Sequence, residues 1–145
     1  MPNTRPLVAA ATICEKVLQE KDGVLSAIRI VDTFYAVTPQ SNLPEDVKAG
    51  TQVTALISLK SGDITGSQEV QLVARKPSGE VKEVGKWPVI FKGGEHGANF
   101  TINMMISATD FGLWWFDVIW QGEVLTSIPL KLVQQQTAEP QPEKH

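Results

Sequence analysis

Apolar and polar side chains alternate with a period of two over much of this chain, and this alternation constrains the fold more than any other feature. In 51–60, every second residue from Val53 to Leu59 is apolar, with mostly polar residues between them. The same pattern recurs in 68–76, 98–107 and 124–133. A period of two is typical of a β-strand that buries one face. The chain is therefore predicted to be built from β-strands.

Turn-forming residues separate these runs. Glycine accompanied by Asp, Ser, Pro or Gln occurs at 22–23, 61–63, 77–79 and 121–122, and a glycine pair occurs at 93–94. Such residues tolerate the backbone angles of tight turns. With further strands expected at 7–19, 27–37, 80–92 and 113–120, the chain would hold about eight strands joined as antiparallel hairpins. The predicted fold class is all-β, an antiparallel two-sheet β-sandwich of immunoglobulin-like type.

Residues 12–20 allow two interpretations. Thr12 and Glu15 have the spacing of a helix capping box, and Ile13, Val17 and Leu18 could form an apolar helical stripe. The alternative is a long strand, 7–19, that turns at Asp22-Gly23 into the next strand. The strand is favoured, because Asp-Gly is a hairpin signal and the following segment is rich in β-branched and aromatic residues.

The length of 145 residues suits one domain with a single core. We expect this β-sandwich domain to span 1–134. One short helical turn is expected near 44–49, with Pro44 at its first position and acidic residues after it. Residues 135–145 have almost no apolar side chains and two prolines, which predicts a disordered C-terminal tail.

Two segments carry a resemblance to known proteins. Residues 112–132 read as a glycine, an aromatic strand, a glycine-containing turn and a Pro-Leu-x-Leu strand, which resembles the closing hairpin of immunoglobulin-like and fibronectin-type sandwiches. Taken with 13–36, the chain is similar to a family of small bacterial β-sandwich proteins classed as a domain of unknown function. The resemblance covers most of 7–133. It implies the fold and no catalytic residues.

Composition and charge exclude several classes of function. No window approaches the roughly 18–20 apolar residues of a membrane-spanning helix, so no membrane partner is expected. The net charge is −3 and Lys/Arg clusters are absent, so no nucleic-acid partner is expected. Cys14 is the single cysteine, and the N-terminal apolar stretch 7–11 is too short for a secretory signal. These features predict a cytoplasmic protein.

The chemically reactive residues are few. The histidines are His96 and His145, and a zinc site needs four ligands, so neither a metal nor another cofactor is predicted. His96 is interpreted as a solvated loop residue, and Cys14 as a buried, inert thiol rather than a nucleophile paired with His96. The chain is therefore predicted not to be an enzyme.

Calcium is a possible ligand, because β-sandwiches can bind it between loops. Six to eight oxygen ligands must converge on the ion. The acidic residues in predicted turns are single and scattered over separate loops, so solvated turn acids are the preferred interpretation. They are Asp22, Glu45, Asp46, Asp63, Glu95 and Asp110.

Strand 113–120 is apolar on both faces. Residues 114, 116, 118 and 120 are all apolar, and the opposite phase is Leu113, Trp115, Asp117 and Ile119. Asp117 marks this second phase as the outer one, because burying an unpaired carboxylate is costly. Leu113, Trp115 and Ile119 are thus predicted to form an interaction surface. Trp87, beside Pro88 on the expected edge strand, is a further candidate for this interaction surface. The alternative is that Trp87 caps the core.

Three interpretations of this surface remain open. Long Lys or Arg side chains and the terminal segments could cover Trp115. A protein partner or a second copy of the chain could bind it, since aromatic residues contribute much of the affinity of interfaces. A sugar could stack on an exposed indole. The predicted function is a non-enzymatic protein–protein interaction or self-association module, and the alternative is a small-ligand or carbohydrate-binding module.

Overall fold

The computed structural model describes residues 5–38, 50–107 and 110–136, and these residues form seven β-strands and no helix. The strands are β1 (Leu7–Gln19), β2 (Leu25–Ile30), β3 (Thr33–Thr38), β4 (Gly50–Arg75), β5 (Val81–Ser107), β6 (Gly112–Trp120) and β7 (Glu123–Gln136). The all-β prediction is confirmed, and so is the strand interpretation of residues 12–19. The helical turn expected near 44–49 lies outside the described residues. The tail expected at 135–145 begins later than predicted, because residues 135 and 136 belong to β7, and 137–145 lie outside the described residues.

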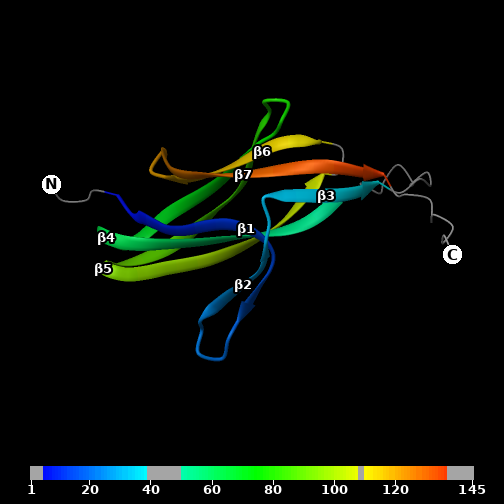
Figure 1. Cartoon of the computed structure of the whole chain (residues 1–145). Coiled ribbons are helices and arrows are strands. Elements are labelled where there is room, and N and C mark those ends of the chain that lie inside the picture. The colour runs from blue at the N-terminus through cyan, green and yellow to red at the C-terminus, as the bar shows by residue number, and fades with distance from the viewer. Residues whose placement is uncertain (1–4, 39–49, 108–109, 137–145) are drawn as a thin grey trace.

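All seven strands belong to one hydrogen-bonded sheet, with the order β2-β1-β4-β6-β7-β3 and with β5 paired to β4. The first half of β4 pairs with β1 and with the second half of β5, whereas the second half of β4 pairs with β6 and the first half of β5. In Figure 1, β1 lies with β4 and β5, and β6, β7 and β3 lie together above them. β4 and β5 thus link the two halves of the sheet.

The turns expected at 61–63 and 93–94 are bends inside β4 and β5 rather than strand ends. Gly62 pairs with Gly94, and both have positive φ angles, 60° and 64°. The register shifts on both sides of this pair. The buried Ser61 hydroxyl bridges the irregularity, since it donates to the His96 carbonyl (3.0 Å) and accepts from the Lys92 N–H (3.2 Å). Paired glycines therefore bend the two strands together without breaking the hairpin.

The strand expected at 27–37 is divided, and its second part pairs in an unexpected direction. β2 pairs with β1, the chain bends at 31–32, and β3 then pairs with β7 in parallel, with Phe34 opposite Leu132. The prediction that all strands pair antiparallel is therefore wrong for the β3–β7 ladder. The Lys131 N–H donates to the Asp32 carbonyl (2.9 Å), which ties the bend to β7.

The core confirms the alternation on which the strand predictions rest. One apolar cluster joins residues of both halves of the sheet, from β1, β4, β5, β6 and β7. The alternating run 124–133 predicts Val124 on the inner face together with Ile128 and Leu130, but Val124 is 47% exposed. The register of β6 and β7 shifts between Val118 and Ile119, so Ile119 lies opposite Val124 and the inner position passes to Leu125. A bulge of this kind reverses the phase of the alternation.

Candidate functional site

The outer face of β6 holds three of the four residues predicted as an interaction surface. Trp114, Phe116 and Val118 enter the core, which turns the alternate residues outward. Leu113 is 45% exposed, and Trp115 and Ile119 are half-buried. β7 adds Pro129 opposite Trp115 and Val124 opposite Ile119, both exposed. We call Leu113, Trp115, Ile119, Val124 and Pro129 the β6–β7 face.

Asp117 lies in the middle of this face, and its buried carboxylate is paired with hydrogen-bond donors. It is 7% exposed. The Arg75 guanidinium donates two hydrogen bonds to its carboxylate, from Nε to Oδ2 at 2.8 Å and from Nη2 to Oδ1 at 3.1 Å. The Ser127 hydroxyl donates a third, to Oδ1 at 2.6 Å. β4 and β7 flank β6 and supply these donors. The face therefore contains no unpaired carboxylate that would oppose burial against a partner.

Arg75 also contacts the Trp115 ring. The guanidinium carbon of Arg75 lies 5.6 Å from the centre of the Trp115 ring, which is the geometry of a cation–π contact. Arg75 and Trp115 lie opposite one another on β4 and β6. Asp117 in turn binds the guanidinium, so the three side chains form one connected group.

Trp87 does not belong to the β6–β7 face. It pairs with the core residue Val70 and shares its phase along β5 with Val89 and Phe91, both of which are buried. Its ring packs 6.3 Å from that of Phe100, and it covers one edge of the core. The shared phase with Val89 and Phe91 was visible in the sequence and would have placed Trp87 on the inner face.

Val124 and Pro129 are the members of the face that sequence reasoning missed. Pro129 lies on the opposite phase from the buried Ile128 and Leu130, which is a signal the alternation carries. Val124 had no such signal, because the bulge that exposes it is a property of the β6–β7 pairing.

Cys14 and His96 lie at different places in the sheet. Cys14 is fully buried, as predicted, and its thiol donates to the Thr54 carbonyl at 3.5 Å. Burial raises the pKa of the thiol, and the backbone N–H of Lys16 opposes this only in part. His96 is exposed, as predicted, but lies within β5 beside the Ser61 bend rather than in a loop.

The acidic residues considered for calcium remain separate wherever the structure describes them. Over 5–38, 50–107 and 110–136, no three His, Cys, Asp or Glu side chains are grouped to hold a metal ion. The Asp22 carboxylate accepts from the Val24 N–H (3.1 Å), and Asp110 forms an ion pair with Lys76 (3.5 Å). Glu45 and Asp46 lie outside the described residues. None of the described segments forms a helix long and apolar enough to cross a membrane.

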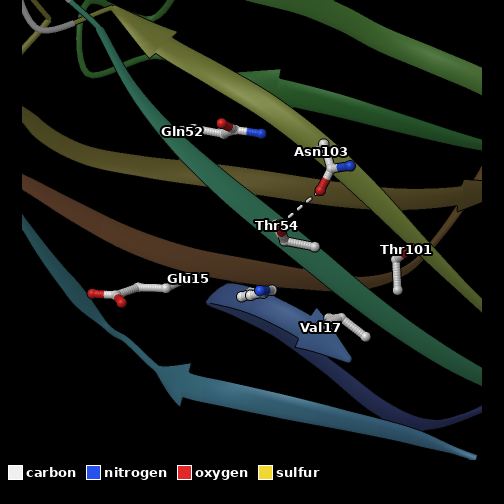
Figure 2. A pocket seen from close by; sticks show the side chains of 7 residues that line it. Glu15, Val17, Gln52, Thr54, Thr101 and Asn103 are labelled. Carbon is white, nitrogen blue, oxygen red and sulfur yellow. Dashed lines mark hydrogen bonds between the residues drawn. The ribbon is translucent and has the colours of Figure 1, made fainter. Parts of the chain in front are cut away.

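A polar hollow of about 390 Å³ opens where β1 separates from β4, and sequence reasoning did not predict it. Beyond Cys14, β1 pairs with β2 and no longer with β4. Figure 2 shows Thr54 and Asn103 on neighbouring strands, and the Thr54 hydroxyl donates to the Asn103 Oδ1 at 2.8 Å. The lining is mostly polar and has no aromatic residue; it consists of Glu15, Lys16, Val17, Gln52, Thr54, Thr101 and Asn103.

Comparison with known proteins gives likenesses to solved structures alone. No protein-family model matches the chain. No curated protein matches it either. Among solved structures, the chain is similar to an immunoglobulin-like protein from Pseudomonas aeruginosa, with 18% sequence identity and a TM-score of 0.42. The match covers 89% of this chain and 97% of that chain.

Proposed function

We propose that this protein is a non-enzymatic binding module that contacts other proteins through the β6–β7 face, and that it acts in the cytoplasm. The observation that carries the proposal is the satisfied Asp117 in the middle of that face. A buried, paired carboxylate between Trp115 and Ile119 leaves a mostly apolar surface, which a partner can cover without burying an unpaired charge.

Two further features support this proposal. Arg75 is bonded to Asp117 and contacts the Trp115 ring, which reduces the side-chain entropy that is lost when a partner covers the indole. Tryptophan and arginine are also the residues that most often contribute large shares of binding energy at interfaces. The non-enzymatic assignment is supported by the burial of the Cys14 thiol and the raised pKa that disfavours its reactive thiolate.

Substitution of Leu113 tests the proposal. Leu113→Glu places a charge at an exposed position of the face, so the fold is retained while binding is disrupted. Ile90→Glu is the matched control, because Ile90 is 67% exposed and lies on β5, which pairs with neither β6 nor β7. Proteins that copurify with the tagged wild-type chain are identified, and the binding of each purified partner is measured by calorimetry.

We expect Leu113→Glu to raise the Kd of such a partner by about tenfold or more, which corresponds to about 1.4 kcal/mol. Ile90→Glu should leave the Kd unchanged. If every partner bound both variants as tightly as the wild type, the β6–β7 face would not be the binding surface.

A further inference from the structure

Among the strands that the structure describes, the second half of β5 forms a long and regular edge of the sheet. Residues 97–107 pair with 60–50 of β4 in one antiparallel register, without a shift from Gly97 to Ser107. Among the described residues, β5 has no other strand partner. In Figure 2, β4 lies between β5 and β1, so the other side of β5 is the edge. Backbone N–H and C=O groups along such an edge can pair with another strand.

This edge carries none of the usual protection against strand pairing. Residues 97–107 contain no charged residue and no proline. The first half of the same strand, 81–92, also lies at an edge, but it contains Lys82, Lys86, Pro88 and Lys92. Lysine and proline are the residues that natural edge strands use to prevent pairing. The contrast within one strand indicates that the second half is open for a partner strand.

β2, another strand at the edge of the sheet, is a weaker candidate. It is six residues long and includes Arg29, whose positive φ of 55° distorts the strand. Arg29 also forms an ion pair with Glu15 at 3.1 Å. Both the distortion and the charge oppose regular pairing with another strand.

Inward apolar and outward polar side chains alternate along the β5 edge, as they do along a strand in the interior of a sheet. Ile102, Met104 and Ile106 are buried on the inner side. Asn99, Thr101, Asn103 and Met105 point outward and are exposed, Met105 by 70%. A strand added to this edge would need the same order of inward apolar and outward polar residues to extend both surfaces.

We propose that residues 97–107 pair antiparallel with the same residues of a second copy of this chain, about a twofold axis at Ile102. This register places Phe100 opposite the second copy's Met104 on the inner side, and Thr101 opposite its Asn103 on the outer side. Every inward residue meets an inward one, as an isologous contact requires. Because the segment is uncharged, self-pairing places no like charges opposite one another.

The size of the contact is consistent with a stable dimer. Eleven residues paired along each strand form about ten backbone hydrogen bonds, which is the number of a typical protein interface. The two copies would share one continuous sheet through their β5 strands. The β6–β7 face stays free in this dimer, so the inference is independent of the proposed function.

Lysine substitutions at the edge test the inference. Thr101 and Met105 are exposed and point outward, so Thr101→Lys with Met105→Lys introduces the protection that the first half of β5 already has. Val81→Lys with Ile90→Lys is the matched control, since these residues are 61% and 67% exposed on the protected half. Mass is measured by light scattering over a range of concentrations, with circular dichroism to confirm the fold of each variant.

We expect the wild type and the control to approach twice the chain mass of 15.9 kDa as concentration rises. The edge variant should have a dimer Kd at least about tenfold higher. A wild type that stays at 15.9 kDa up to about 100 µM would overturn the inference. A dimer whose Kd is unchanged by the edge substitutions would also overturn it. If only Leu113→Glu disrupted the dimer, self-association would be assigned to the β6–β7 face instead.

Discussion

At the scale of single residues, the Cys14 thiol lies at the point where β1 separates from β4. It is fully buried and donates to the Thr54 carbonyl at the last pair of the β1–β4 ladder. The thiol therefore satisfies a backbone acceptor beside the polar hollow, where the ladder ends.

Burial of this thiol predicts a loss of stability at alkaline pH. The folded state raises the pKa of Cys14 above its ordinary value of 9.0, so folding favours the protonated thiol. This contribution is fully present below about pH 9 and is lost as the pH rises through the folded pKa, because the unfolded thiol then ionises more readily. Urea unfolding between pH 7 and 10.5 measures the loss. Cys14→Ser removes the titrating group, and parallel pH profiles for both proteins would contradict the prediction.

The Arg75–Asp117 pair predicts a second effect at this scale. Arg75→Ala leaves the buried carboxylate with Ser127 as its remaining donor among the described residues. Because the Arg75 side chain is 44% exposed, solvent compensates in part, and we expect a loss of about 1–2 kcal/mol. Arg29→Ala is the control, since its pair with Glu15 is more exposed and should contribute less than about 1 kcal/mol. Equal losses in urea unfolding would show that the Asp117 network contributes no more than a surface pair.

At the scale of elements, Gly85 allows β5 to carry Trp87 at the edge of the core. A Cβ atom at Gly85 would lie 2.7 Å from the Trp87 ring, and the β4–β5 register shifts beside it, between Leu72 and Val73. Gly85→Ala should therefore displace the indole and destabilise the protein by about 1–3 kcal/mol. Gly97→Ala is the control, because its Cβ would make contacts of 3.5 Å or more. Thermal unfolding and tryptophan fluorescence measure both, and equal effects would contradict the steric explanation.

The elements also show how far sequence reasoning reaches. The hairpin signal at Asp22-Gly23 predicted β1 with its bounds. Alternation predicted the inner sides of β4 and β6, because one buried face leaves a local pattern. Turn-forming residues predicted strand ends at 61–63 and 93–94, where Gly62 and Gly94 instead pair and bend two strands together. Glycine permits a positive φ, but only pairing decides whether the strand then continues.

The candidate site was predictable in part for the same reason. Asp117 identified the outer phase of β6, which is a local signal. Its partner Arg75 comes from a strand 42 residues away, and the bulge that exposes Val124 depends on the register of β6 and β7. The parallel β3–β7 ladder joins segments about a hundred residues apart. Nothing in the local sequence encodes such pairings.

At the scale of the whole molecule, β4 and β5 connect the two halves of the sheet. They are consecutive in sequence, and their hairpin can form before distant segments meet. β3 and β7 lie far apart in the chain, so their pairing carries a larger loop-closure cost. The β4–β5 hairpin is therefore expected to form early in folding, and the β3–β7 ladder late.

Two leucines test this order. Leu72 in β4 and Leu132 in β7 are both 1% exposed, and each truncation to alanine should cost about 2–5 kcal/mol. Leu72 lies opposite Gly85 in the hairpin, and Leu132 lies opposite Phe34 in the late ladder. We expect Leu72→Ala mainly to slow folding and Leu132→Ala mainly to accelerate unfolding. Stopped-flow folding and unfolding rates in urea measure both. The reverse partition would mean that the distant strands pair first and that the β4–β5 hairpin completes the fold around them.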